Sequence, residues 1–191
     1  MDEQKRLENY LEFRIPVKKC ADWVGLSQAI RSALKAAGIP INWQWRFHHH
    51  MTILYLDNHK CVDQLTPGFA KCLSGLSAFP LNIDKVDAFT TGNGAEHIVC
   101  LTTTQIPPQV TALAQSTRTL ADGLGADYDH RPFKCHITLG RIPADRATLA
   151  QVQTALAMVT PPAITCPVTE AEHRYRGGTL IKNWKLTKEM K

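Results

Sequence analysis

Long apolar runs are absent from this 191-residue sequence. It contains no stretch of about 18 apolar residues, the length needed to cross a bilayer. The first ten residues, MDEQKRLENY, are polar and mixed in charge, unlike the apolar centre of a signal peptide. A large excess of positive or negative charge is also absent. Lys and Arg outnumber Asp and Glu by only 22 to 17, an excess too small to wrap a long nucleic acid. We therefore expect a soluble, cytoplasmic protein with no membrane partner.

Closely spaced cysteines are lacking as well. The six cysteines are scattered with no Cys-x-x-Cys pair, which argues against a zinc ribbon and against a thioredoxin-like motif. Low-complexity segments and long linkers are missing too, and 44% hydrophobic residues can build one sizeable core. These features predict a single domain over residues 1–191. Nothing in the sequence points to an obligate protein partner, so we expect a monomer.

Hydrophobic periodicity predicts an α+β chain whose two halves share one order of elements. The first half contains expected strands at 10–17, 47–56, 81–89 and 96–103 and expected helices at 21–37, with Asp22 as N-cap, and 62–76. The last two strands meet across Thr91-Gly-Asn-Gly94, a favourable hairpin sequence.

The second half contains expected helices from Pro107 to Gly123 or Gly125 and at 144–159, and strands at 134–141, 164–175 and 179–186. Its last two strands turn at Gly177-Gly178. Both halves therefore contain the order helix, strand, helix, strand, strand, which indicates an internal duplication. We expect lobe repeats of about 10–105 and 106–187 that join near Ile106-Pro-Pro108.

Two His-x-Thr triplets occupy corresponding strands of this layout, His50-Met-Thr52 and His136-Ile-Thr138. Roughly one such triplet is expected by chance in a chain of this composition, so the matched position matters more than the triplet. Residues two apart on a strand project to the same face, so each motif presents an imidazole beside a hydroxyl. Alternatively, these are ordinary strand histidines beside good strand-forming threonines.

This set of groups suits a phosphodiester and requires no metal or other cofactor. One imidazole of the pair His50 and His136 is neutral and can take a proton from the attacking oxygen. The other is protonated and can donate a proton to the leaving oxygen. Thr52 and Thr138 can donate hydrogen bonds to the non-bridging phosphate oxygens. Which histidine is the acid and which the base stays open.

The segments FHHHMTILYL (47–56) and FKCHITLGRI (133–142) resemble the motif strands of the two-histidine phosphoesterase superfamily, near its RNA 2′,5′-ligase and 2′,3′-cyclic phosphodiesterase branch. The resemblance implies a bilobal α+β fold with two pseudo-twofold lobes, each with an antiparallel sheet and helices, around a central cleft. It assigns His50 and His136 to catalysis, and Thr52 and Thr138 to phosphate binding. Family members often have proline where Cys135 stands, which leaves the subfamily open.

The substrate that the resemblance implies is a small nucleotide or an RNA end. We expect hydrolysis of a 2′,3′-cyclic phosphate to a monoester, with strand joining as the reverse of the same chemistry. Two alternatives stay open: cleavage of 2′,5′-linked or cyclic oligonucleotide signals in an antiviral or anti-defence setting, and a non-catalytic nucleotide- or RNA-binding module. The second is disfavoured because binding alone needs neither imidazole.

Four neighbours are further candidates for substrate contact. Arg141 follows the second motif, although strict alternation places it opposite His136 and Gly140 would have to re-aim it. Phe133 and Tyr175 could stack on a base or pack in the core. His48 shares a strand face with His50 and could lie at the cleft rim. A zinc or iron site at these histidines lacks a third ligand at a diagnostic spacing.

Overall fold

The computed structural model describes residues 8–20, 22–44, 49–56, 61–161 and 163–187. Its strands form two antiparallel sheets and a ribbon of two strands. Sheet A contains, in spatial order, β10 (Leu180–Lys185), β9 (Glu170–Tyr175), β1 (Asn9–Arg14) and β3 (His50–Leu56). Sheet B contains β2 (Asn42–Trp43), β7 (His136–Pro143), β6 (Glu96–Thr102) and β5 (Lys85–Thr90). The ribbon pairs β4 (Phe79–Ile83) with β8 (Ile164–Val168).

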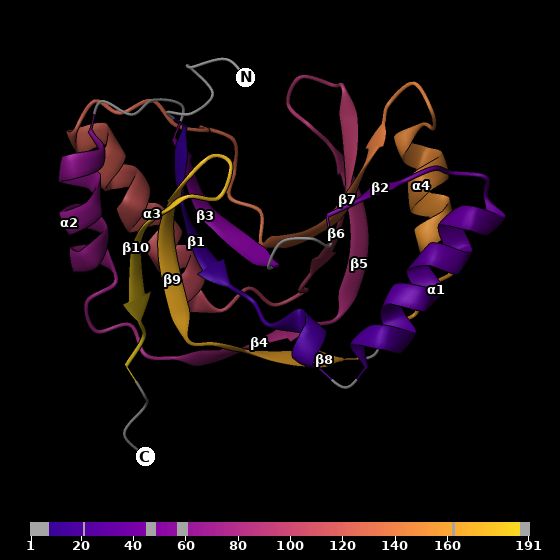
Figure 1. Ribbon diagram of the computed structural model, residues 1–191, viewed down its shortest axis with the longest axis horizontal. Helices are drawn as coiled ribbons and strands as arrows, with labels where there is room; N and C mark the ends of the chain where they lie inside the picture. Colours follow the sequence, from indigo (N-terminus) through magenta and orange to yellow (C-terminus); the bar gives the residue numbers. More distant parts are fainter. Residues whose placement is uncertain (1–7, 21, 45–48, 57–60, 162, 188–191) are drawn as a thin grey trace.

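Each sheet carries two helices on its outer face, so the molecule has two lobes (Figure 1). The helices α2 (Val62–Cys72) and α3 (Pro108–Gly123) cover sheet A, whereas α1 (Trp23–Ala36) and α4 (Leu149–Leu156) cover sheet B. A short 3-10 helix, η2 (Val17–Lys19), links β1 to α1, and the β4–β8 ribbon joins the lobes at their base. The expected α+β fold with two antiparallel sheets and helices is confirmed.

The two sequence halves exchange strands, so they are not the two lobes. Sheet A combines β1 and β3 of the first half with β9 and β10 of the second, and sheet B combines β5 and β6 with β7. The expected junction at Ile106-Pro107-Pro108 is one of several places where the chain passes between lobes, here from β6 to α3. The lobe repeats of about 10–105 and 106–187 therefore keep their element order but do not delimit the lobes.

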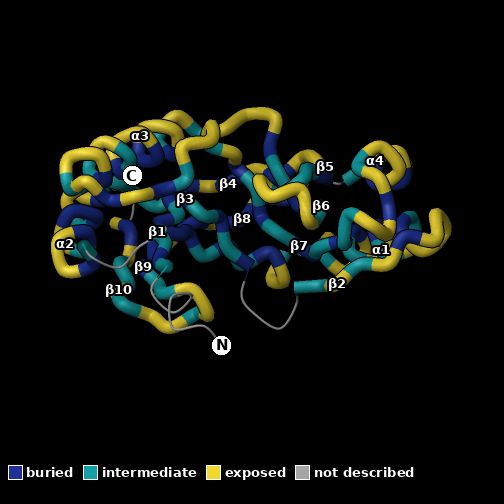
Figure 2. Tube along the Cα trace, turned by 90° about the horizontal axis from the view of Figure 1, so that it is seen from above, coloured by how far each residue is buried: buried dark blue, intermediate teal, exposed yellow. Residues whose placement is uncertain are grey.

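The core lies between each sheet and its helices, where burial follows the strand alternation (Figure 2). In β1, Leu11 and Phe13 face the helices and are fully buried, while Tyr10 and Arg14 on the other face are half-buried. Because alternate side chains leave opposite faces of a strand, the outer face of each sheet supplies the apolar packing. The inner faces of sheets A and B are left for polar groups.

Both glycine-containing turns lie where the sequence predicts them. The β5–β6 hairpin closes across Thr91–Gly94, and Gly94 has φ +72°. The β9–β10 turn uses Gly177 and Gly178 at φ +96° and +93°, a region in which a side chain would be strained. The helix α1 begins directly after Asp22, the expected N-cap position, but the Asp22 side chain makes no capping hydrogen bond.

Three expected elements differ most from the observed ones. The strand expected at 81–89 is split into β4 and β5, which belong to different sheets, and the strand expected at 164–175 is split into β8 and β9 in the same way. The helix expected at 144–159 begins only at Leu149. Its start is fixed by a capping box, in which the Thr148 side chain accepts from the Gln151 amide and the Gln151 side chain accepts from the Thr148 amide. Within the described ranges, no helix is long and apolar enough to cross a membrane.

Candidate active site

The two His-x-Thr motifs lie on strands β3 and β7, which contact each other between the lobes. His50 and Thr52 are half-buried, while Met51 between them is fully buried. The second motif has the same pattern, with His136 and Thr138 half-buried around a buried residue. Each strand therefore presents its imidazole and hydroxyl on one face, as the alternation predicts.

A β-bulge follows the threonine in each motif strand. The pairing of β3 with β1 shifts register at Ile53, and the pairing of β7 with β6 shifts at Leu139. Two residues of the motif strand then oppose one residue of the partner, so the alternation slips by one. As a result Tyr55 and Arg141 are half-buried and return to the face of the histidines.

This bulge corrects the expectation that strict alternation places Arg141 opposite His136. Arg141 lies on the same face, and its guanidinium donates to Glu96 Oε2 at 2.9 Å. Its charge also contributes to lowering the pKa of His136, so the two groups are within electrostatic reach. Gly140 does have a structural role here, because a Cβ at this position would meet the side chain of Ile41 at 2.7 Å.

His136 is held by a backbone hydrogen bond and an aromatic edge. Its Nδ1 donates to the Lys134 carbonyl oxygen at 2.8 Å, which leaves Nε2 as the nitrogen available to a ligand. Phe89 meets the ring edge-to-face at 5.0 Å between centroids. Burial lowers the pKa of His136, and the charges of His50, Lys134 and Arg141 lower it further against the opposing effect of the backbone hydrogen bond. This imidazole is therefore neutral at neutral pH.

His50 has different neighbours. Its Nδ1 lies 3.6 Å from Oε2 of Glu12, a carboxylate that is fully buried in β1. The Tyr10 ring stacks on the imidazole with 5.9 Å between centroids. Burial raises the pKa of Tyr10 to about 12, and the negative charge of Glu12 acts in the same direction. Tyr10 therefore stays neutral and contributes a flat surface rather than a proton.

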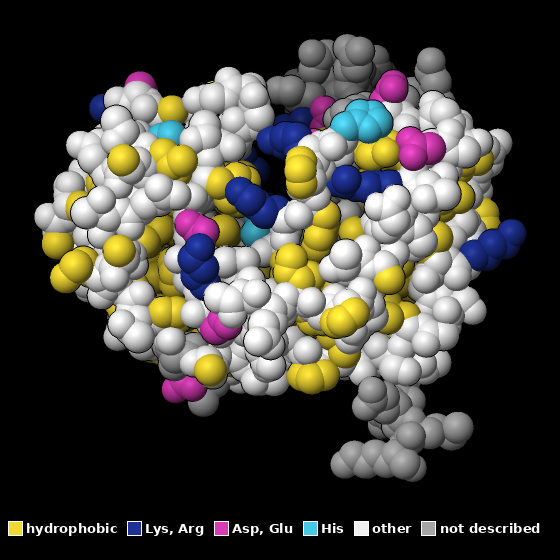
Figure 3. All heavy atoms as spheres, turned by 180° about the vertical axis from the view of Figure 1, so that it is seen from behind, with side chains coloured by type: hydrophobic (Ala, Val, Ile, Leu, Met, Phe, Trp, Pro, Cys, Tyr) yellow, Lys and Arg dark blue, Asp and Glu magenta, His cyan; other side chains and the backbone are white. Residues whose placement is uncertain are grey.

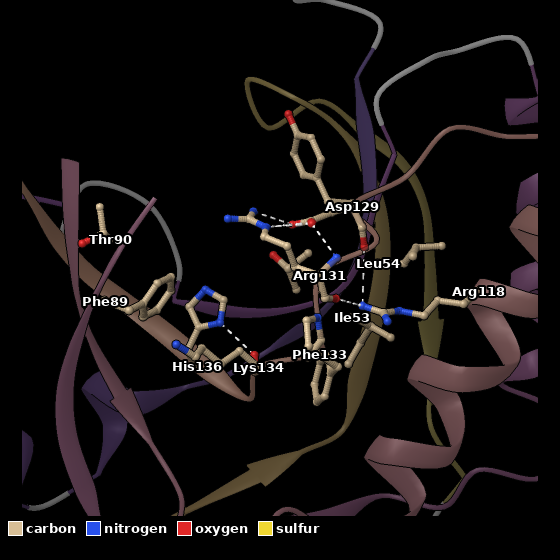
Figure 4. Close-up of a pocket in the computed structure, with 13 residues that line it drawn as sticks. Ile53, Leu54, Phe89, Thr90, Arg118, Asp129, Arg131, Phe133, Lys134 and His136 are labelled. Atoms are coloured by element: carbon tan, nitrogen blue, oxygen red, sulfur yellow. Dashed lines mark hydrogen bonds and ion pairs between the residues drawn. The ribbon is translucent and has the colours of Figure 1, made fainter. Parts of the chain in front are cut away.

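A cleft of about 430 Å³ opens between the lobes beside these strands. Figure 4 shows His136 and Phe89 on one side of it and the 129–133 segment on the other. Thr52 and Tyr55 line the cleft from β3. The expected central cleft is thus present, and it combines a motif imidazole and a motif hydroxyl with aromatic walls. Rings of this kind can stack on a nucleobase.

The cleft is also basic. Arg118, Arg131 and Lys134 line it, and in the space-filling view from behind Lys and Arg side chains gather around a hollow (Figure 3). The Lys134 ammonium lies 4.2 Å from the centre of the Phe89 ring, and Arg131 is paired with Asp129. Arg118 donates to the Arg131 carbonyl oxygen at 2.5 Å and so supports that segment. Cations arranged in this way favour an anionic ligand.

The remaining predicted residues have different outcomes. Phe133 lines the cleft and stays a candidate for substrate contact. Tyr175 does not line it, because its register opposite Asn9 places it on the helix-facing side of sheet A. His48 lies outside the described residues. His49 is buried and packs edge-to-face on Trp23, away from the motif face. Among the residues that the structure describes, no group of three His, Cys, Asp or Glu side chains is placed to hold a metal ion.

Several site residues were not predicted from the sequence. Glu12 alternates with Leu11 and Phe13 and shares the polar face of its strand with Tyr10 and Arg14, so the sequence pattern does not distinguish it from an exposed carboxylate. Phe89 has no signal in the sequence either, because β5 lies beyond β6 in sheet B and only the tertiary fold brings its ring to His136. Lys134 is two residues before His136, so its position in the sequence could have marked it.

The paired imidazole and hydroxyl strands at a basic cleft between two lobes define a two-histidine phosphoesterase. The sequence model of the 2′-5′ RNA ligase superfamily matches residues 57–179, more than half of the chain, and the protein belongs to that superfamily. The matched region includes His136 and Thr138 and begins just after the first motif. Comparison with curated proteins gave no sequence match.

Solved structures with the same fold include LigT from E. coli, in complex with 3′-AMP. It is 19% identical with a TM-score of 0.63, over 95% of this chain and 99% of that one. A phosphoesterase crystal structure is 20% identical with a TM-score of 0.60, over 96% and 99% of the two chains. Usb1 from Kluyveromyces marxianus, with uridine monophosphate, is 7% identical with a TM-score of 0.64, over 97% and 100%. At these identities the matches establish the fold.

Proposed function

We propose that the protein is a phosphodiesterase that opens 2′,3′-cyclic phosphates of nucleotides or RNA ends to phosphomonoesters, with His50 and His136 as the acid–base pair and no metal ion. The observation that carries this proposal is the placement of the two imidazoles, each with a threonine on the same strand face, on contacting strands between the lobes. Acid–base catalysis requires such a pair near one phosphate.

In the proposed reaction, water attacks phosphorus and gives its proton to the neutral imidazole. The bond from phosphorus to one ribose oxygen breaks, and that oxygen receives a proton from the protonated imidazole. Thr52 and Thr138 donate hydrogen bonds to the non-bridging oxygens and hold the phosphate between the rings. One water is consumed, one monoester and one free hydroxyl are formed, and the two imidazoles have exchanged protonation states.

The relatives support nucleotides as the ligand class. LigT from E. coli has been crystallised with 3′-AMP and with phosphate, and Usb1 from Kluyveromyces marxianus with uridine monophosphate. A nucleoside 3′-monophosphate is the kind of product that opening of a 2′,3′-cyclic phosphate yields. The aromatic and basic lining of the cleft supplies contacts for a base, from Phe89 and Phe133, and for phosphate, from Lys134.

Cleavage of 2′,5′-linked or cyclic oligonucleotides is the second candidate. The feature that favours it is the number of cations in the cleft, because Arg118 and Arg131 line it in addition to Lys134. A mononucleotide has one phosphate at the reaction site, whereas an oligonucleotide brings further phosphates that these cations can meet.

The test uses the purified protein with a chelator, the four 2′,3′-cyclic nucleotides and a 2′,5′-linked dinucleotide. We expect turnover that falls about 10²- to 10⁴-fold in His50→Ala and in His136→Ala, because each removes one proton-transfer group. His130→Ala is the matched control, since His130 is exposed and does not line the cleft, and it should retain activity. Tight nucleotide binding without turnover would indicate a binding module, and turnover unchanged in both variants would refute the site.

A further inference from the structure

The two imidazoles of the site have unlike partners at the same ring nitrogen. His136 Nδ1 donates to the backbone carbonyl of Lys134 at 2.8 Å, whereas His50 Nδ1 lies 3.6 Å from the carboxylate of Glu12. A carbonyl carries a partial charge and a carboxylate a full one, so only the second can compensate a ring that has gained a proton. The pseudo-twofold pair is therefore chemically asymmetric.

The asymmetry arises from one pair of equivalent positions. Glu12 in β1 lies opposite Thr52 across the bulge of β3, and Cys100 in β6 lies opposite Thr138 across the bulge of β7. Cys100 is buried and uncharged, and burial raises the pKa of its thiol to about 12. One lobe thus has a carboxylate on the strand next to its motif strand, and the other lobe has a neutral thiol at the equivalent position.

Glu12 is fixed by more than its burial. Its Oε1 lies 3.3 Å from Arg174 Nε, and Arg174 donates to Glu172 Oε2 at 2.6 Å. Arg14, which lies opposite His50 in the register, is 3.4 Å from the same Glu172 oxygen. A buried carboxylate is costly unless it is paired, and the Arg174 guanidinium offsets that cost while the other carboxylate oxygen stays 3.6 Å from His50 Nδ1.

We propose that Glu12 is a positioning residue that fixes the His50 ring with Nε2 directed to the substrate and compensates its positive charge, which makes His50 the general acid and His136 the general base. This assignment rests on the proposed phosphodiesterase function. It specifies the roles that the pseudo-symmetry of the two motifs leaves open.

The surroundings of both rings agree with this assignment. Around His50 stand the neutral Tyr10 ring, the carboxylate of Glu12 and the opposite cation Arg14, with His136 on the facing strand. Around His136 stand the cations Lys134 and Arg141, and together with burial these lower its pKa. A neutral His136 can accept a proton from water. A His50 whose positive charge is compensated by Glu12 can donate a proton to the ribose oxygen as the bond from that oxygen to phosphorus breaks.

The first arm of the test compares two carboxylate-to-amide variants, Glu12→Gln and Glu172→Gln. Both remove a buried negative charge beside Arg174, but only Glu12 faces His50. We expect Glu12→Gln to lower kcat on a 2′,3′-cyclic nucleotide about 10- to 100-fold with little change in KM, less than the loss from removing an imidazole. Glu172→Gln should leave kcat within about threefold of the parent. Equal losses in the two variants would overturn the proposal.

The second arm tests the roles with cyclic nucleotides in which the 2′ or the 3′ bridging oxygen is replaced by sulfur. A thiolate is a good leaving group that departs without a proton. With such a substrate, the kcat of Glu12→Gln and of His50→Ala should lie within about threefold of the kcat of the parent protein, while the kcat of His136→Ala stays low. Restoration of His136→Ala instead would reverse the two roles and overturn the assignment.

A third arm does not depend on turnover. In ¹⁵N spectra of the histidine rings, Glu12→Gln should shift the His50 nitrogens and leave those of His136 unchanged, while Glu172→Gln should shift neither. Unchanged His50 signals in Glu12→Gln would overturn the positioning role even in an active enzyme. If the parent protein hydrolyses no phosphodiester but this shift is seen, the proposed function fails while the positioning of His50 by Glu12 stands.

Discussion

Gly140 and Ile41 approach so closely that a Cβ at position 140 would lie 2.7 Å from Ile41 Cδ1 and 2.9 Å from the Asn42 carbonyl oxygen. This contact allows β2 to pair with β7, with Trp43 opposite Gly140 and Asn42 opposite Arg141. Gly140 also comes directly after the bulge at Leu139, which turns Arg141 toward the histidines. The edge of sheet B beside the active site therefore depends on a residue without a side chain.

Gly140→Ala should destabilise the protein by about 1–3 kcal/mol, because the added methyl group overpacks a contact that includes backbone. The free energy of unfolding, measured by chemical denaturation, checks this. Gly25→Ala is the matched control, since Gly25 lies in α1 with nothing within 4 Å of its missing Cβ. It should stabilise the protein by up to about 1 kcal/mol. A Gly140→Ala protein as stable as the parent would contradict the close packing of β2 on β7.

The acid limb of the pH–rate profile should lie below the ordinary range of histidine. Burial lowers the pKa of His136, and the proposed base must be neutral to act, so kcat/KM should be lost as the pH falls below about 6.5. The measurement is kcat/KM for a 2′,3′-cyclic nucleotide across pH 4 to 9. An acid limb centred at or above the ordinary histidine pKa would argue that His136 is not the base.

Phe133→Ala should weaken substrate binding, whereas Tyr175→Ala should not. Phe133 lines the cleft, and loss of one stacking contact with a base costs about 1–3 kcal/mol. That corresponds to a decrease of roughly 5- to 150-fold in kcat/KM. Tyr175, a ring on the helix-facing side of sheet A, serves as the control. Equal decreases in both variants would mean that the aromatic effect is not specific to the cleft.

Folding stability should decrease between pH 6.5 and 4 through His173. This ring is fully buried between Thr66, Asn9 and the edge of Phe69, and burial lowers its pKa to about 4. The unfolded chain takes up this proton near pH 6.5 and the folded protein only near pH 4. The free energy of unfolding is therefore highest above pH 6.5 and decreases as the pH falls toward 4. The decrease due to His173 is up to about 3 kcal/mol, at 1.36 kcal/mol for each unit of pKa.

The check on His173 is the difference between the parent protein and His173→Gln, whose side chain does not titrate. Unfolding free energies at pH 7 and pH 4.5 should differ less in the variant than in the parent protein. Carboxylates and His136 contribute to both proteins alike, so the comparison isolates one group. The same pH dependence in both proteins would show that His173 is not the buried neutral ring described here.

The sequence predicted helices and hairpins well but not the places where strands change sheets. The strand expected at 81–89 breaks at Asp84, which is exposed like the Lys85 that follows it, and the strand expected at 164–175 breaks at Thr169. At both sites the apolar alternation slips by one residue. That slip is present in the sequence and marks the break, because an unbroken strand keeps its period of two.

The candidate site was predictable only as far as local pattern defines it. His50, Thr52, His136 and Thr138 share a face because of strand geometry alone. The position of Arg141 depends on a bulge at Leu139, which only the register with β6 reveals. The contacts of His50 with Glu12 and of His136 with Phe89 arise between strands far apart in the chain, and strand periodicity carries no information about them.

The exchange of strands between the sequence halves governs how this protein is completed as it leaves the ribosome. Sheet A, which carries His50, contains β9 and β10, so its edge beyond β1 stays open until nearly the whole chain has been synthesised. Neither half can assemble a finished sheet on its own, and pairings that span most of the chain slow folding. A nascent chain that stalls after β6 therefore exposes an unpaired edge of β1, which is a site for association with other chains.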